Sequence, residues 1–176
     1  MYTDLILHVD TAAHTLDAAV LGVSATLFRM EDTTTPLEHW YYPVQLNGQG
    51  RHIDMEVLDE WRSDDAVYPV MISGNPAPLE SVLDRLEEMV ESAQLNAGES
   101  LRVWGACDTD LALLRSCFEQ DDRSTPWNFY QTFDAETLLR ITDVNAVEGE
   151  TPEDFLERRI AALRVAITTP TMRKTA

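Results

Sequence analysis

The chain has 176 residues, of which 13 are Lys or Arg and 31 are Asp or Glu, so its formal net charge is −18. This length is enough for one domain whose core needs neither disulfides nor a structural metal. Proteins that coat DNA or RNA need clustered Lys and Arg to neutralise phosphates. An acidic chain whose one lysine is Lys174 is therefore not expected to bind nucleic acid in that way.

The charge is unevenly distributed along the sequence. All 31 acids lie at or before Glu157, together with eight basic residues, which gives −23; the last 19 residues hold five basic residues and give +5. Two interpretations stay open. The acids could form solvated faces beside a basic last helix, or they could form a surface that attracts a basic partner by electrostatic steering.

The cysteines and the N-terminus bear on the cellular compartment. Cys107 and Cys117 cannot form a disulfide framework and lack the local histidine spacing of a zinc site, so we expect small buried residues in a reducing cytoplasm. Residues 1–4 lack the basic region of a signal peptide, and the longest nearly apolar run, 18–28, is too short to cross a bilayer. The sequence predicts a cytoplasmic protein that does not associate with membranes.

Three strands are predicted in the first third of the chain. Residues 5–9 form an apolar run that ends at Asp10, as expected for a buried strand that delivers an acid to its C-terminal end. Apolar residues over 18–28 predict a second strand. The aromatic segment 39–44 predicts a third, with Pro43 favouring an edge or a strand end. We expect these strands to pair antiparallel.

The remainder of the chain is predicted to be mainly helical. Apolar spacing indicates, in order, a helix over 54–62, a helix after Pro78, a strand over 101–104, a helix with Leu111, Leu114 and Phe118, a strand over 129–133, a helix from Ala135 and a helix from about Pro152. The inner face of the last helix is expected to hold Phe155, Leu156, Ile160, Leu163 and Ile167. This order predicts an α/β fold with a mixed central sheet, an antiparallel first three strands and helices on both faces. We expect one domain over 1–170 and a short basic tail over 171–176.

Four sequence blocks occur in an order and spacing that resemble a known family. They are Asp-Thr-Ala at 10–12 with the strand pattern at 18–25, Tyr-Pro-Val at 42–44 with 53–61 and Pro78-Leu79, Val-Trp-Gly at 103–105 with Asp110, and Pro-Trp-Asn-Phe at 126–129. Together they resemble the DEDD-type 3′–5′ exonucleases of the ribonuclease H-like fold, especially the compact exoribonuclease-like proteins of bacteria and phages. The resemblance covers most of the chain.

This resemblance implies a site for two divalent metal ions. In the family, the first strand ends Asp-x-Glu, an acid follows the Trp-Gly strand, and the last helix carries His and Asp five residues apart. Four carboxylates then hold Mg²⁺ or Mn²⁺ for phosphodiester hydrolysis, and the histidine deprotonates the attacking water. The matching residues are Asp10 and Asp110, with Asp108 as a substitute for Asp110; these three are the expected ligands if a metal is retained.

The chain departs from the family at the other site positions. Ala12 stands where the family has the glutamate of Asp-x-Glu. On the register that aligns Leu156, Glu153 and Arg158 stand at the histidine and aspartate positions of the last helix, with an uncertainty of about one residue. Two of four metal-binding carboxylates and the general base are therefore missing.

The arginines of the last helix offer a replacement for the cations. An arginine does not deprotonate in a protein, so Arg158 and Arg159 cannot act as the base. Either one could pair with Asp10 or Asp110 and stand in for a metal ion. The alternative is that both arginines face solvent.

The sequence thus favours one function and leaves others open. The favoured one is a catalytically degenerate exonuclease-fold protein that has no cofactor and works by binding another protein. It would be a phage-encoded acidic inhibitor or nucleic-acid mimic. Its partner would be the basic surface of a host nucleic-acid-processing factor. The alternative is an active Mg²⁺- or Mn²⁺-dependent 3′–5′ exonuclease on single-stranded DNA or RNA, with Asp10, Asp108, Asp110 and Glu136 in a rearranged site. A third is a scaffold or homodimer module.

Overall fold

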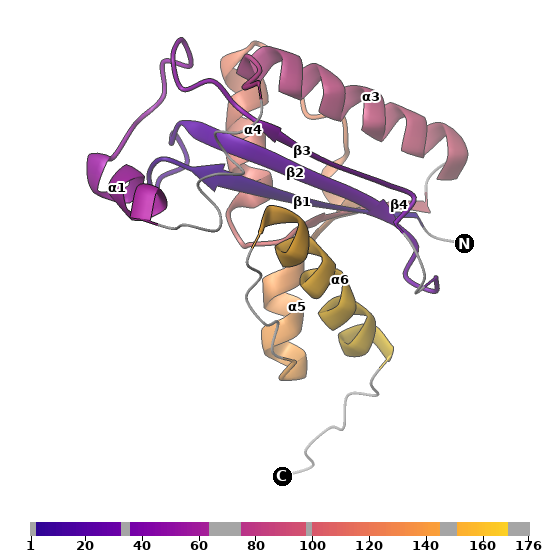
Figure 1. Ribbon diagram of the computed structural model, residues 1–176. Helices are drawn as coiled ribbons and strands as arrows, with labels where there is room; N and C mark the ends of the chain where they lie inside the picture. The colour runs from indigo at the N-terminus through magenta and orange to yellow at the C-terminus, as the bar shows by residue number, and fades with distance from the viewer. Residues whose placement is uncertain (1–2, 33–35, 64–74, 98–99, 145–150, 169–176) are drawn as a thin grey trace.

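The computed structural model describes residues 3–32, 36–63, 75–97, 100–144 and 151–168 (Figure 1). The elements follow in the order β1 (Thr3–Thr11), β2 (Val20–Phe28), β3 (Glu38–Pro43), α1 (Met55–Ser63), α3 (Leu79–Ala97), β4 (Leu101–Gly105), α4 (Asp110–Gln120), the 3-10 turn η2 (Phe129–Gln131), β5 (Thr132–Asp134), α5 (Ala135–Thr142) and α6 (Pro152–Thr168). Among these described helices, none is long and apolar enough to span a membrane.

One five-stranded sheet runs through the molecule in the order β3-β2-β1-β4-β5. The pairs β1–β2 and β2–β3 are antiparallel, whereas β1–β4 and β4–β5 are parallel. This confirms the predicted mixed sheet with an antiparallel first part. Pro43 is the last residue of β3 at the edge of the sheet, where its missing N–H removes no ladder hydrogen bond from a central strand.

Helices cover both faces of the sheet. Figure 1 shows α3 on one side and α5 and α6 on the other. Side chains alternate along β1, so Leu5 and Leu7 pack in the core with α3 and α4, while Ile6 packs in the core with α5 and α6. His8 and Asp10 share the face of Ile6 and therefore lie on the α6 side. This alternation decides which helix meets the polar end of β1.

Two predicted details are wrong. The strand over 129–133 is a 3-10 turn followed by the three-residue β5, because Asn128 and Gln131 form a capping box that closes the turn before the strand begins. Near the end of α6, Ala166 takes the inward position three residues after Leu163, and Ile167 is exposed. The basic tail predicted over 171–176 lies outside the described residues.

Candidate functional site

An imidazole ring lies between two buried carboxylates at the C-terminal end of β1. Nε2 of His8 is 3.3 Å from Oδ1 of Asp10, and Nδ1 is 3.3 Å from Oδ2 of Asp110. His8 and Asp10 are two residues apart on one strand, so the pleat places them on the same face. Asp10 and Asp110 are only 4% and 3% exposed, which makes a charged partner for them energetically important.

Asp110 also ties the loop after β4 to β1. It is the first residue of α4; its Oδ1 accepts the backbone N–H of Val9 at 3.2 Å, and its Oδ2 accepts the backbone N–H of Cys107 at 2.7 Å. These two N–H groups lie just past the last paired residues of the parallel β1–β4 ladder. The carboxylate is therefore a structural acceptor for the backbone as well as a partner of His8.

The ring of His8 is enclosed by two further contacts. Phe155 of α6 lies against it with ring centroids 4.4 Å apart and planes tilted by 36°. Sγ of Cys107 is 3.9 Å from Nδ1. Strand β1, the β4–α4 loop and the start of α4 thus contribute to one small polar cluster, which we call the His8 cluster: His8, Asp10, Cys107 and Asp110. Helix α6 covers it with Phe155.

The electrostatics of the cluster favour a protonated His8. Burial by itself lowers the pKa of a histidine, but the charge of Asp110 and the hydrogen bonds to Asp10, Asp110 and Cys107 outweigh it and raise the pKa of His8 well above 6.5. The imidazolium then carries one positive charge between two carboxylates.

This raised pKa predicts that stability falls in mildly alkaline solution. The folded state binds the His8 proton more tightly than the unfolded state, so the stabilisation is complete below about pH 6.5 and is lost as the pH rises through the folded pKa. Urea unfolding in chelator-treated buffer between about pH 6 and 9 measures it. His8→Gln should lose this pH dependence, and exposed His14→Gln should keep it. Equal pH dependence in the wild type and His8→Gln would contradict the assignment.

Beside the cluster, a pocket of about 380 Å³ opens at Asp10. Its walls include His14 and, from α1, Glu60 and Trp61. The indole N–H of Trp61 donates to the carbonyl of Thr11 at 2.9 Å and fastens α1 to the end of β1. Within the described part of the chain, Oδ2 of Asp10 is buried and has no hydrogen-bond partner.

Tyr41 approaches Asp10 across a glycine. Burial, followed by the nearby negative charge of Asp10, raises the pKa of the Tyr41 phenol, so the hydroxyl stays protonated. Gly22 pairs with Asp10 in the β1–β2 ladder, and a Cβ on Gly22 would lie 2.7 Å from two ring carbons of Tyr41. Because Gly22 has no side chain, the Tyr41 phenol can occupy this position.

Gly22→Ala is therefore expected to lower the free energy of unfolding by about 1–3 kcal/mol, because the Tyr41 ring must move. Urea unfolding of the variant measures the loss. In a double-mutant cycle with Tyr41→Leu, the cost of Gly22→Ala should shrink, since the smaller side chain leaves room for the methyl group. Additive effects of the two substitutions would show that the contact is not the cause.

The structure brings together only some of the residues implied by the resemblance. Asp10 and Asp110 meet through His8. Asp108 is exposed, and Glu136 accepts a hydrogen bond from Arg140 within α5. Among the described residues, the polar side-chain contacts of His8 are confined to the His8 cluster, so neither Asp108 nor Glu136 takes part.

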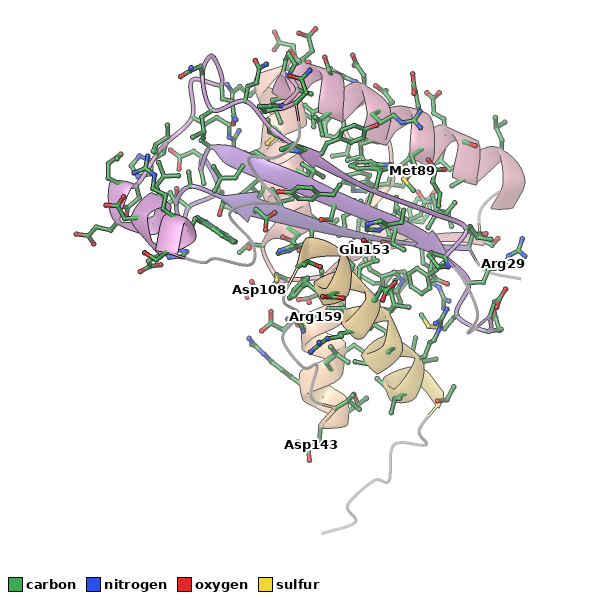
Figure 2. The ribbon with its side chains drawn as sticks, in the orientation of Figure 1. Arg29, Met89, Asp108, Asp143, Glu153 and Arg159 are labelled. Atoms are coloured by element: carbon green, nitrogen blue, oxygen red, sulfur yellow. The ribbon has the colours of Figure 1, made fainter. Side chains whose placement is uncertain are left out.

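The positions at which this chain departs from the family pattern lie outside the His8 cluster. Ala12 is fully buried in a small apolar cluster that includes Leu21 and Leu58. Glu153 is exposed in the first turn of α6, and Figure 2 shows Glu153, Asp108 and Arg159 below the sheet, around the N-terminal half of α6. The guanidinium of Arg159 lies 5.0 Å from the centroid of the Phe155 ring.

The hypothesis of an arginine that replaces the metal is not what the structure shows. Within the described ranges, the ion pairs of Asp10 and Asp110 are both with His8 rather than with Arg158 or Arg159. Sequence reasoning missed His8 because it sought a histidine on the last helix. The signal that was present is the spacing of His8 and Asp10 along a predicted strand.

The residues of the cluster do not fit a pair of Mg²⁺ or Mn²⁺ ions. Such ions need several hard oxygen ligands, and two ions about 3.5–4 Å apart need carboxylates on both sides. Here two carboxylates converge, and the His8 ring takes the space between them. The side chain of Ala12 offers no oxygen, and the Glu153 side chain is exposed.

Comparison with known proteins identifies the family. The chain belongs to the family of the 3'-5' exoribonuclease Rv2179c-like domain, whose model matches residues 3–174. No curated protein sequence matches the chain. The DEDD-type relationship predicted from the sequence is confirmed.

Solved structures confirm the ribonuclease H-like exonuclease fold. The metal-free E. coli ExoI–ssDNA complex superposes with a TM-score of 0.63 at 10% identity over 97% of this chain and 41% of that chain, so the present chain spans about two fifths of its length. The nuclease domain of 3'hExo, a DEDDh family member bound to rAMP, gives 0.57 at 9% identity over 94% and 90% of the two chains. Cell-death related nuclease 4 gives 0.53 at 13% identity over 94% and 63%.

Proposed function

We propose that this member of the exoribonuclease-like family does not hydrolyse nucleic acid through a two-metal site and instead acts by binding a basic protein surface. The observation that carries the proposal is the position of the His8 ring, 3.3 Å from both Asp10 and Asp110. A protonated side chain that pairs with both carboxylates offsets part of their negative charge, as a divalent ion does in a metal-dependent nuclease. Two ions would have to displace it.

The local charge balance supports this. Two divalent ions bring four positive charges, and four carboxylates would offset them. The cluster supplies two carboxylates, and the nearby helix α6 carries Arg158 and Arg159 within the span where the family has its last ligand. Positive charge beside a site with half the carboxylates raises the free energy of binding two divalent ions.

The surface that we assign to the partner is the acidic stripe of α3. Its members recur at helical spacing on the solvent side of the helix: Glu80, Asp84, Glu87, Glu88 and Glu91. With Arg85, the helix has a net charge of −4. Among the described residues, ion pairs are shown for Asp84, Glu87 and Glu88, with Arg123 or Arg85, but for neither Glu80 nor Glu91. A row of carboxylates on a rigid helix suits a surface that otherwise binds phosphates, so we propose an acidic inhibitor or nucleic-acid mimic.

A nuclease assay tests the loss of catalysis. The purified protein is incubated with labelled single-stranded DNA and RNA and with Mg²⁺ or Mn²⁺, beside an Asp10→Ala variant. We expect no degradation above the Asp10→Ala background. Degradation that disappears in Asp10→Ala would overturn the proposal. A variant with Ala12→Glu, Glu153→His and Arg158→Asp restores the family pattern and shows whether the fold still supports the chemistry.

A titration tests the partner. Labelled protein is titrated with purified nucleic-acid-processing enzymes at about 0.05 M and 0.3 M NaCl. For a true partner, we expect association to slow about tenfold or more at the higher salt and in Glu80→Gln/Glu91→Gln. The control Asp143→Asn/Glu157→Gln removes the same charge from exposed positions elsewhere and should bind like the wild type. If neither the higher salt concentration nor Glu80→Gln/Glu91→Gln weakens binding, the acidic stripe is not the binding surface.

A metal-dependent 3′–5′ exonuclease is the second candidate function. It is favoured by Oδ2 of Asp10, which is buried without a hydrogen-bond partner among the described residues, as a metal ligand would be once its ion is removed. The nuclease assay decides between the two functions. A phage origin, a cytoplasmic location and homodimer formation stay predictions.

A further inference from the structure

Three donor atoms of different chemistry converge in the His8 cluster. Nδ1 of His8 is 3.3 Å from Oδ2 of Asp110 and 3.9 Å from Sγ of Cys107, and all three atoms lie within 4.8 Å of one another. They come from β1, the β4–α4 loop and the start of α4. Hydrogen bonds from the backbone N–H groups of Val9 and Cys107 to Asp110 hold these three segments together. One nitrogen, one sulfur and one oxygen thus surround one point.

Their spacing is close to that of a tetrahedral zinc site. Typical bonds to Zn²⁺ are about 2.0–2.1 Å for His nitrogen, about 2.3 Å for Cys sulfur and about 2.0–2.2 Å for carboxylate oxygen. At tetrahedral angles, these lengths place nitrogen and oxygen about 3.4 Å apart, and nitrogen and sulfur about 3.6 Å apart. The observed 3.3 and 3.9 Å are within about 0.3 Å of these separations, and the third pair, sulfur and oxygen, lies within 4.8 Å.

The surroundings of the ligands also match a metal site. A histidine that binds a metal through one ring nitrogen usually donates the other N–H to a carboxylate, which fixes its orientation. Nε2 of His8 lies 3.3 Å from Oδ1 of Asp10, which is itself buried. Asp110 is oriented by the backbone N–H groups of Val9 and Cys107.

We propose that His8, Cys107 and Asp110 bind one Zn²⁺ ion through Nδ1, Sγ and Oδ2, with Asp10 as the carboxylate that positions His8. Three protein ligands leave the fourth position open to water or to another ligand. A thiolate and an imidazole select zinc over Mg²⁺ or Mn²⁺, which prefer oxygen. The site therefore differs in chemistry from the carboxylate site of the family. The inference shares the His8 cluster with the proposed function but not the acidic stripe, and a bound Zn²⁺ would take the place of the proton between His8 and Asp110.

Metal titration of the whole chain tests this proposal. The protein is freed of metal with a chelator, then titrated with Zn²⁺ against a chromophoric competitor and, separately, with Co²⁺, whose bond to a thiolate absorbs in the near ultraviolet. We expect one equivalent of Zn²⁺ and a thiolate–cobalt band that is lost in Cys107→Ser. Asp10→Asn should weaken Zn²⁺ binding by about 10–100-fold while one equivalent still binds.

The second cysteine provides a matched control. Burial raises the pKa of the Cys117 thiol to about 11, and Cys117 packs in the core with α3 and α4, so Cys117→Ser should keep the cobalt band. Far-UV circular dichroism verifies that each variant is folded. Failure of the wild type to bind Zn²⁺, a band that persists in folded Cys107→Ser, or displacement of Zn²⁺ by equimolar Mg²⁺ would each overturn the proposal.

Discussion

Asp110→Ala is expected to lower the free energy of unfolding by about 3–5 kcal/mol. The carboxylate accepts the backbone N–H groups of Val9 and Cys107 and lies 3.3 Å from Nδ1 of His8, all in a nearly buried setting. Alanine leaves both N–H groups without this acceptor and leaves His8 with one carboxylate instead of two. Unsatisfied buried groups of this kind are among the most destabilising changes known in proteins.

A neighbouring aspartate gives the control for Asp110. Asp108 lies two residues earlier, in the same loop, and is exposed. Asp108→Ala removes the same charge and should change the free energy of unfolding by no more than about 0.5 kcal/mol. Urea unfolding at one pH measures both variants. Similar losses for the two would mean that charge in the loop, rather than the buried hydrogen bonds of Asp110, determines stability.

Asp4→Ala is expected to have an effect of the same size, about 3–5 kcal/mol. Asp4 is fully buried at the start of β1. Its carboxylate accepts Nε and Nη2 of Arg102 at 2.7 and 2.8 Å, and its Oδ1 also accepts the indole N–H of Trp104 at 2.8 Å. The substitution removes the acceptor of a two-pronged guanidinium contact and of a buried indole, both from β4.

An exposed ion pair is the matched control for Asp4. Asp59 and Arg62 lie 2.8 Å apart on α1, with both side chains exposed. Asp59→Ala should cost at most about 1 kcal/mol, because water screens the pair and already solvates both charges. Thermal or urea unfolding compares the two. If Asp59→Ala costs as much as Asp4→Ala, burial is not the source of the difference.

Local patterns in the sequence were sufficient to predict most elements of the fold. The apolar run that ends at Asp10, the aromatic strand that ends at Pro43 and the helix after Pro78 each follow from short-range periodicity. The same reasoning wrongly predicted a strand over 129–131. A capping box between Asn128 and Gln131 outweighs the aromatic residues that favour a strand. Hydrogen bonds from side chains to the backbone are not visible in apolar spacing.

The site was predicted less completely because its contacts are long-range. His8 meets Cys107 and Asp110 across 99 and 102 residues, so local spacing could not reveal the cluster. The two carboxylates pair with His8, a side chain already on β1, and α6 places Phe155 against the His8 ring. Ala12, where the resemblance implies a glutamate, lies in an apolar cluster with Leu21 and Leu58, surroundings in which a carboxylate would be costly.

A crystal structure after a soak in Mn²⁺ tests the central claim most directly, namely that His8 takes the place of the metal ions between Asp10 and Asp110. Anomalous scattering locates manganese without ambiguity. The account predicts that the His8 ring stays between the two carboxylates and that no pair of manganese ions appears there. Two manganese ions about 3.5–4 Å apart, bound by Asp10 and Asp110 with His8 rotated away, would contradict it.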